Sequence, residues 1–217
     1  MINAVIFDMD GLLVDSEPTW RKVEIACFAK VGLTLTEDDC KQTMGLRIDE
    51  VVDYWFEKHP WEGMTTAEMT TYIVDEMERE LRENAVPMPG VMEVIQQLKN
   101  EGYKMAIASS SQMRLIDAVM EKLDLDQLIG VRCSAETEDY GKPHPAVFIT
   151  AAHWMNTNPE NCVVFEDSLH GVVAAKAAKM KCIAVPDEVD YKKPQFAIAD
   201  QLLKSLKDFD LNSILGW

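Results

Sequence analysis

From about residue 88 onward, short runs of strand-forming residues alternate with stretches of helical periodicity, and this pattern constrains the fold more than any other feature. The expected strands lie at 104–109, 131–134, 162–166 and 182–185, with an earlier one at 3–7. The expected helices lie at 91–100, 112–122, 145–155 and 169–179. Such alternation is typical of βα units, whose right-handed crossovers bring the carboxyl ends of parallel strands to one edge. The sequence therefore predicts an α/β fold with a parallel sheet.

Residues 16–86 interrupt this alternation. They contain no convincing strand, and their periodicity predicts helices over 18–31, 48–58 and 66–83. The segment Val-Pro-Met-Pro-Gly at 86–90 marks the return, because proline limits helix formation and glycine permits a turn. One hinge is expected there and the other near Val14 to Glu17. We therefore expect a helical insertion of residues 16–86 in a core made of residues 1–15 and 87–217.

Residues able to carry chemistry follow the apolar strands in an ordered series. In chain order they are Asp8, Asp10, Ser109, Lys142, Glu166 and Asp167. A pair of aspartates one residue apart arises by chance about once in a chain of this length, so the pair alone carries little weight. The ordered series is more specific, because open α/β sheets bind ligands at the carboxyl edge that these residues share.

The same residues also have ordinary structural interpretations. Lys142 alone is typical of a solvated surface lysine, and Glu166-Asp167 before a helix is typical of an N-cap. As members of the series they favour a functional interpretation, because clusters of perturbed ionisable groups recur at active sites. The four histidines show no metal-ligand spacing and no neighbouring nucleophile, so we expect none to be catalytic.

Taken in this order, the segments around the series resemble the four motifs of the haloacid dehalogenase superfamily of phosphatases, from Ile2 to about Pro186. The resemblance implies a Rossmann-like parallel sheet core with an inserted helical cap domain. It implies that Asp8 is the nucleophile and that Asp10 is the general acid and base. The residues it implies for phosphate binding are Ser109, Ser110 and Lys142, and those for Mg²⁺ are Asp8, Asp10, Glu166 and Asp167.

Substrate choice is expected to lie in the inserted helices, because the core motifs recognise only phosphate. Asp15-Ser16-Glu17-Pro18-x-Trp20, with residues 45–49 and Pro60-Trp61, resembles the branch of bacterial hexitol and 2-deoxyglucose-6-phosphate phosphatases. This resemblance implies hydrolysis of a sugar or sugar-alcohol phosphate through an aspartyl-phosphate. Arg47 is a candidate for contact with the substrate, and a solvated arginine is the other interpretation. The aromatic residues of the insertion are expected mostly to pack between helices.

Two other functions stay open. A β-phosphoglucomutase would return the phosphoryl group to a sugar hydroxyl, but that branch carries a histidine at the hinge where this chain has Trp20. A phosphorylatable signalling module of the receiver type, or a sugar-phosphate-binding protein without turnover, belongs to a different class. Receiver modules are shorter and lack a cap, and no residue of the series is missing here.

The composition limits the partners that we expect. A net charge of −16 and a pI near 4.6 argue against nucleic acid, since binding to its backbone depends largely on clustered Lys and Arg. Five scattered cysteines are odd in number and show no metal-binding spacing, so we expect them to be reduced. No segment approaches the roughly 20 apolar residues that span a bilayer. A cytoplasmic monomer acting on a small phosphorylated substrate is the expectation.

Overall fold

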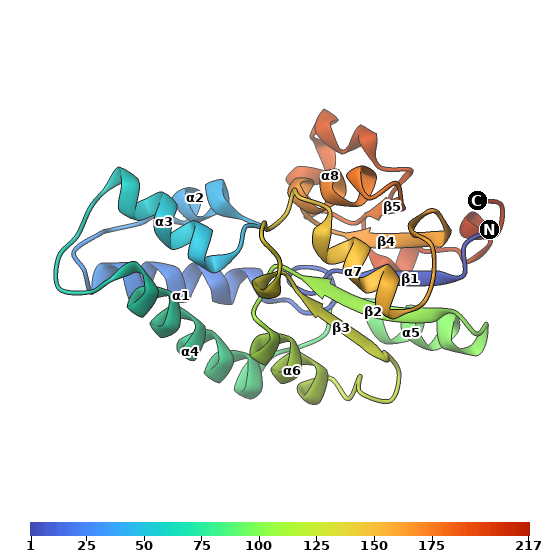
Figure 1. Cartoon of the computed structure of the whole chain (residues 1–217), viewed down its shortest axis with the longest axis horizontal. Coiled ribbons are helices and arrows are strands. Elements are labelled where there is room, and N and C mark those ends of the chain that lie inside the picture. Colours follow the sequence, from blue (N-terminus) through green and yellow to red (C-terminus); the bar gives the residue numbers. More distant parts are fainter.

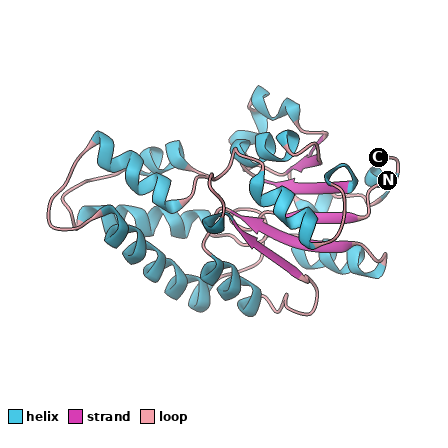
Figure 2. Ribbon diagram, viewed as in Figure 1, coloured by secondary structure: helices cyan, strands magenta, loops and turns pink.

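The computed structural model describes residues 1–217 and contains one six-stranded parallel sheet with the strand order β3-β2-β1-β4-β5-β6 (Figure 2). The strands are β1 (Ala4–Phe7), β2 (Lys104–Ser109), β3 (Val131–Ser134), β4 (Cys162–Glu166), β5 (Lys181–Ala184) and β6 (Gln201–Leu202). The predicted α/β fold with a parallel sheet is confirmed. The sixth strand was not expected, because two half-buried edge residues leave no pattern in the sequence.

Helices cover both faces of the sheet (Figure 1). On one face lie α5 (Val91–Asn100) and α6 (Met113–Lys122), together with the short carboxyl-terminal α9 (Asn212–Leu215). On the other lie α7 (Ala146–Trp154) and α8 (Leu169–Ala177). Alternate residues of β1 enter the two corresponding hydrophobic clusters. A strand buried on both faces shows no polar alternation, which explains the continuous apolar run before Asp8.

Between β1 and β2 the chain forms a helical lobe, seen at the left of Figure 1. It consists of α1 (Glu17–Ala29), α2 (Glu37–Cys40), α3 (Ile48–Lys58) and α4 (Thr66–Asn84). Helix α4 packs against α1 and α3 within the lobe and against α6 beside the sheet. The four-residue α2 was not expected, because it is too short to show helical periodicity; a capping box between Thr36 and Asp39 begins it.

Two connections join the lobe to the sheet, and they run side by side. Val14 forms an antiparallel bridge with Pro87. The Asp15 backbone N–H donates to the Val86 carbonyl at 3.1 Å, and the Met88 N–H donates to the Leu13 carbonyl at 3.1 Å. This pairing holds the lobe at the carboxyl edge of the sheet.

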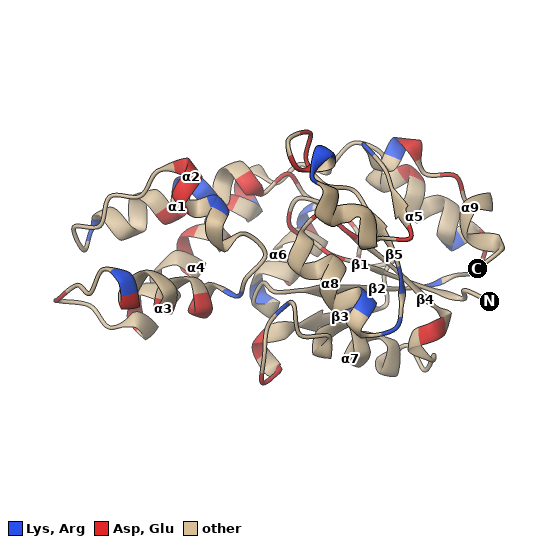
Figure 3. Cartoon of the chain, turned by 90° about the horizontal axis from the view of Figure 1, so that it is seen from above, with Lys and Arg blue, Asp and Glu red and all other residues tan.

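Charged residues of both signs are distributed over the lobe and the sheet region (Figure 3). The ribbon shows no continuous basic segment, in keeping with the net charge of −16. None of the helices combines the length and the apolar character that crossing a membrane would require.

Candidate active site

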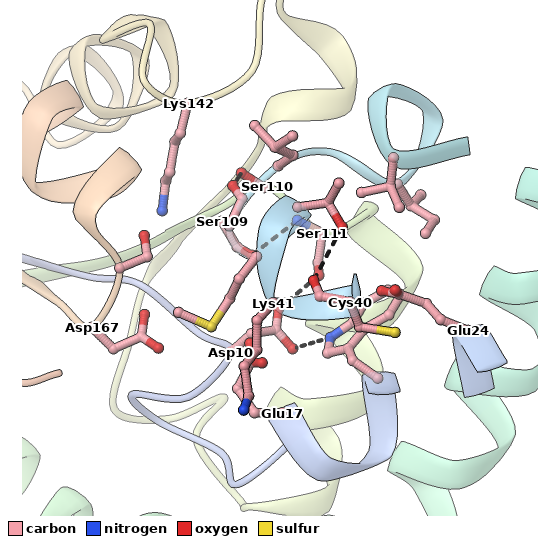
Figure 4. Close-up of a pocket in the computed structure, with 18 of the residues that line it drawn as sticks. Asp10, Glu17, Glu24, Cys40, Lys41, Ser109, Ser110, Ser111, Lys142 and Asp167 are labelled. Carbon is pink, nitrogen blue, oxygen red and sulfur yellow. Dashed lines mark hydrogen bonds between the residues drawn. The ribbon is translucent and has the colours of Figure 1, made fainter. Parts of the chain in front are cut away.

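A cleft lies between the carboxyl ends of the strands and the helical lobe (Figure 4). The lining residues from the core are Asp8, Asp10, Ser109, Ser110, Ser111, Lys142, Asp167 and Ser168. The lobe contributes Glu17, Trp20, Arg21, Glu24, Cys40, Lys41, Thr43, Met44, Gly45, Leu46, Ile48 and Val51. Six of the eight candidates named from the sequence therefore share one cleft, and Glu166 and Arg47 are not part of its lining.

Lys142 is a buried cation at one side of this cleft. Its Nζ lies 2.5 Å from Asp8 Oδ1 and 2.6 Å from Glu166 Oε1, and only 2% of its side chain is exposed. Burial alone would lower the pKa of Lys142, but the carboxylates of Asp8 and Glu166 raise it above its usual value. Lys142 is therefore a fixed positive charge beside Asp8, rather than the solvated lysine of the alternative interpretation.

Glu166 lies beneath the cleft and positions its neighbours. Its carboxylate accepts hydrogen bonds from the Ser168 backbone N–H at 2.8 Å and the Ser168 hydroxyl at 2.9 Å, in addition to Lys142. The N-cap of α8 is Ser168, whose hydroxyl accepts from the Gly171 N–H at 3.0 Å. The capping interpretation of the acidic pair is thus wrong, because the residue after the pair performs that role.

Gly171 provides the space that Glu166 occupies. A Cβ at this position would lie 1.6 Å from Glu166 Oε1, so Gly171→Ala should displace a buried carboxylate from Lys142. We expect the free energy of unfolding to fall by about 3 kcal/mol, the scale for breaking a buried ion pair. That loss exceeds the roughly 1 kcal/mol by which alanine is favoured over glycine in a helix.

Urea denaturation of the Gly171→Ala variant measures this loss. Gly130→Ala is the matched control, because a Cβ there meets no atom within 4 Å. Equal stability of the two variants would contradict the steric role of Gly171.

The acidic residues at this edge fit a divalent cation. Carboxylate oxygens of Asp8, Glu166 and Asp167 lie within 4.8 Å of one another, and all three residues are buried. The one ammonium among these three carboxylates is that of Lys142. When all four groups are ionised, the cluster carries two excess negative charges. Burial and the neighbouring carboxylates raise the pKa of Asp167 well above its usual value. A hard cation such as Mg²⁺, which prefers oxygen ligands, would relieve this repulsion.

Gly11 allows the first loop to approach these acids closely. Its φ of +73° lies in the region that favours glycine, and a Cβ would lie 2.2 Å from Asp167 Oδ2. Both the backbone angle and the close approach therefore require glycine at this position.

Three hydrogen-bond donors orient the carboxyl group of Asp10. Ser16 Oγ at 2.6 Å and Trp20 Nε1 at 2.8 Å donate to Oδ1, while Ser111 Oγ at 2.7 Å donates to Oδ2. Trp20 belongs to the lobe and Ser111 to the core, so Asp10 lies where the two parts meet. Neither Ser16 nor Ser111 was predicted to contact Asp10; the serine run at 109–111 is the signal that points to the second.

The remaining candidates occupy different positions. Ser109, buried at the end of β2, accepts a hydrogen bond from the Ser111 N–H at 3.0 Å. Ser110 donates its hydroxyl to the Gly45 carbonyl of the lobe at 3.0 Å. The Arg47 guanidinium pairs with Asp49 at 2.7 Å and donates to two core carbonyls, those of Ala135 at 3.1 Å and Glu138 at 2.8 Å. Arg47 thus joins the lobe to the core instead of lining the cleft.

Known proteins similar to this chain in sequence include hydrolases and phosphatases. A family model described as haloacid dehalogenase-like hydrolase matches residues 5–185. Hexitol phosphatase B of Escherichia coli (strain K12) is 37% identical over 216 residues, which cover 99% of this chain and 97% of that protein. The phosphorylated carbohydrates phosphatase of Thermotoga maritima is 31% identical over 182 residues, 84% of each chain. Both relatives are phosphatases by name, as expected for a phosphoric monoester hydrolase.

Solved structures share the fold. CbbY from Rhodobacter sphaeroides, in complex with phosphate, superposes with a TM-score of 0.88 at 24% identity over 96% of each chain. A β-phosphoglucomutase from Clostridium difficile gives a TM-score of 0.85 at 22% identity, covering 100% of this chain and 96% of the other. The family model and the full-length relatives show that this chain belongs to the haloacid dehalogenase-like hydrolase family.

Proposed function

We propose that this hydrolase is a magnesium-dependent phosphatase of sugar or sugar-alcohol monophosphates. The observation that carries the proposal is the buried pair of Asp8 and Lys142 beside Asp167 on one side of an open cleft. This arrangement suits a phosphoryl group, which needs a nucleophile and concentrated positive charge at one place. The similarity to a hexitol phosphatase and to a phosphatase of phosphorylated carbohydrates supports the sugar class.

In the proposed mechanism the Asp8 carboxylate attacks phosphorus and forms an aspartyl-phosphate, while the bond from phosphorus to the sugar oxygen breaks. Asp10 gives a proton to that departing oxygen. It then takes a proton from the water that attacks the aspartyl-phosphate, which releases phosphate and restores Asp8. The hydrogen bonds from Ser16, Trp20 and Ser111 hold the Asp10 carboxyl at the cleft for both transfers.

Phosphate oxygens are held by the core side of the cleft. Lys142 supplies a fixed charge, and Ser109 and Ser110 supply hydroxyl or backbone N–H donors. Asp8, Asp167 and the backbone carbonyl of Asp10 would hold Mg²⁺, with Glu166 acting through a water. When bound, this ion neutralises the carboxylates and the phosphoryl oxygens, so that Asp8 does not repel its substrate.

We assign residues 16–86 to a cap that closes over the core of residues 1–15 and 87–217. The paired connections at Val14 and Pro87 support a hinge at this place. The lobe lines the side of the cleft remote from Lys142, where the sugar part of the substrate would lie (Figure 4).

Phosphate release from a panel of phosphomonoesters, with Mg²⁺ present or chelated, tests this function. We expect release from hexitol 6-phosphates and 2-deoxyglucose-6-phosphate, and a fall of about 10²-fold or more on chelation, because Lys142 alone cannot balance the carboxylates. Restoring Mg²⁺ after chelation is the control, and activity should return.

Two outcomes would overturn the assignment. Conversion of β-glucose-1-phosphate to glucose-6-phosphate with little phosphate released would indicate a mutase, the activity named for one structural neighbour. Turnover of no phosphomonoester would point to a binding or signalling protein.

A further inference from the structure

The lobe side of the cleft contains an acid that the proposed mechanism does not use. Glu24 lies within α1, is 8% exposed, and lines the cleft together with Cys40 and Lys41. Figure 4 shows Glu24 across the cleft from Lys142 and Asp167. If Lys142 marks the place of the phosphate, as proposed, Glu24 lies on the side where the other end of the substrate would be.

Glu24 has an unused hydrogen-bonding atom at this place. Its Oε2 is shielded from solvent and has no hydrogen-bond partner. Burial raises the pKa of Glu24 to about 8, and a hydrogen bond with the Cys40 thiol opposes this rise. A protonated carboxyl offers one donor as well as acceptor capacity, which matches the chemistry of a hydroxyl group. The Cys40 thiol is a weak donor and leaves Oε2 unpaired, which destabilises a fold, so packing alone does not explain why this residue is a glutamate.

The cations on the same side of the cleft already have acidic partners. Arg21 Nη1 lies 3.4 Å from Glu17 Oε2, and Lys41 Nζ lies 2.8 Å from Asp38 Oδ1. No other lobe residue that lines the cleft is a lysine or an arginine. A second phosphate group here would compete with these carboxylates and would lie beside the acids Glu17 and Glu24, whereas a hydroxyl group can pair with the Glu24 carboxyl.

We propose that Glu24 is a specificity-determining residue that binds a hydroxyl group at the end of the substrate remote from the phosphate. It would favour sugar and sugar-alcohol monophosphates over bisphosphates and over alkyl phosphates that lack such a hydroxyl. Ile48 and Val51, which line the same cleft, are buried apolar residues and offer the substrate no competing polar group. The inference rests on the proposed function, since the core side must hold the phosphate for Glu24 to meet the other end.

The test compares kcat/KM for a hexitol 6-phosphate with kcat/KM for ethyl phosphate, whose alkyl group carries no alcohol hydroxyl. In Glu24→Met the ratio of the two should fall by about 10- to 100-fold, because the apolar side chain leaves a substrate hydroxyl unpaired. Glu24→Gln retains a donor and an acceptor and should keep most of the preference. Glu57→Met is the matched control, because Glu57 is an exposed glutamate of α3 outside the cleft, and its ratio should equal that of the parent.

Thermal unfolding provides a readout that separates binding from a structural role. Removing an unpaired buried carboxyl should leave the melting temperature of Glu24→Met unchanged or raise it by about 2–4 °C. A lower melting temperature with an unchanged preference would make Glu24 structural and overturn the inference. So would a Glu24→Gln variant that loses the preference as fully as Glu24→Met. If the parent enzyme hydrolyses neither ester, the phosphatase assignment itself is wrong. If the parent hydrolyses both and its preference persists in Glu24→Met, only the inference about Glu24 is wrong.

Discussion

Asp8→Asn is expected to lower phosphate release by about 10⁴-fold or more, the scale seen when a catalytic nucleophile is removed. The amide cannot attack phosphorus, and it removes one of the carboxylates proposed to hold Mg²⁺. Steady-state release from a hexitol 6-phosphate measures the loss.

The fold should survive this change. Burial raises the pKa of Asp8, which means that the folded state disfavours its charge, and Lys142 keeps Glu166 as a partner at 2.6 Å. Circular dichroism and thermal unfolding should therefore resemble those of the parent. Asp15→Asn makes the same chemical change at an exposed position on the connection to the lobe and should remain active. Substantial hydrolysis by Asp8→Asn would contradict a covalent mechanism through this residue.

Asp10→Asn is expected to lower kcat/KM for a sugar phosphate by about 10²- to 10⁴-fold, the usual contribution of general acid–base catalysis. The loss should be much smaller for p-nitrophenyl phosphate, because its leaving group departs without a proton. Measuring both substrates separates the acid role of Asp10 from a general effect on binding.

Ser111→Ala is a useful companion to this variant, because it removes one donor to Asp10 and leaves the carboxyl in place. Its loss should be smaller than that of Asp10→Asn and should follow the same dependence on the leaving group. Equal losses for the two substrates in Asp10→Asn would contradict the acid role.

Most of the sheet could be predicted because burial on both faces leaves a clear pattern. The strands predicted at 104–109, 131–134 and 162–166 coincide with β2, β3 and β4, and that at 182–185 differs from β5 by one residue at each end. The strand β6 and the helix α2 were missed, since elements of two and four residues are too short to show a period.

Most of the core side of the cleft could be predicted because its residues end a strand or follow one closely, whereas Lys142 lies in the loop between β3 and α7. Parallel topology alone then brings the ends of β1, β2 and β4 together. The roles of these residues came from the family resemblance, and they stay predictions until the variants are measured.

The lobe side could not be predicted, because its contacts join segments far apart in the chain. Ser111 meets Asp10 across 101 positions, and Arg47 meets the Glu138 carbonyl across 91. Glu24 looks in the sequence like any polar residue of an amphipathic helix. Only the packing of α1 against the rest of the lobe shows that its carboxyl is buried beside the cleft.

Borohydride reduction of enzyme quenched during turnover is the most direct test of covalent catalysis by Asp8. Borohydride converts an aspartyl-phosphate to homoserine, and fragmentation of the peptide by mass spectrometry separates position 8 from position 10. The proposed mechanism predicts homoserine at position 8. It should be enriched in Asp10→Asn turning over p-nitrophenyl phosphate, because this leaving group departs without the acid whereas hydrolysis of the aspartyl-phosphate is slowed. Homoserine at position 10, or an unmodified peptide from an enzyme that is releasing phosphate, would contradict it.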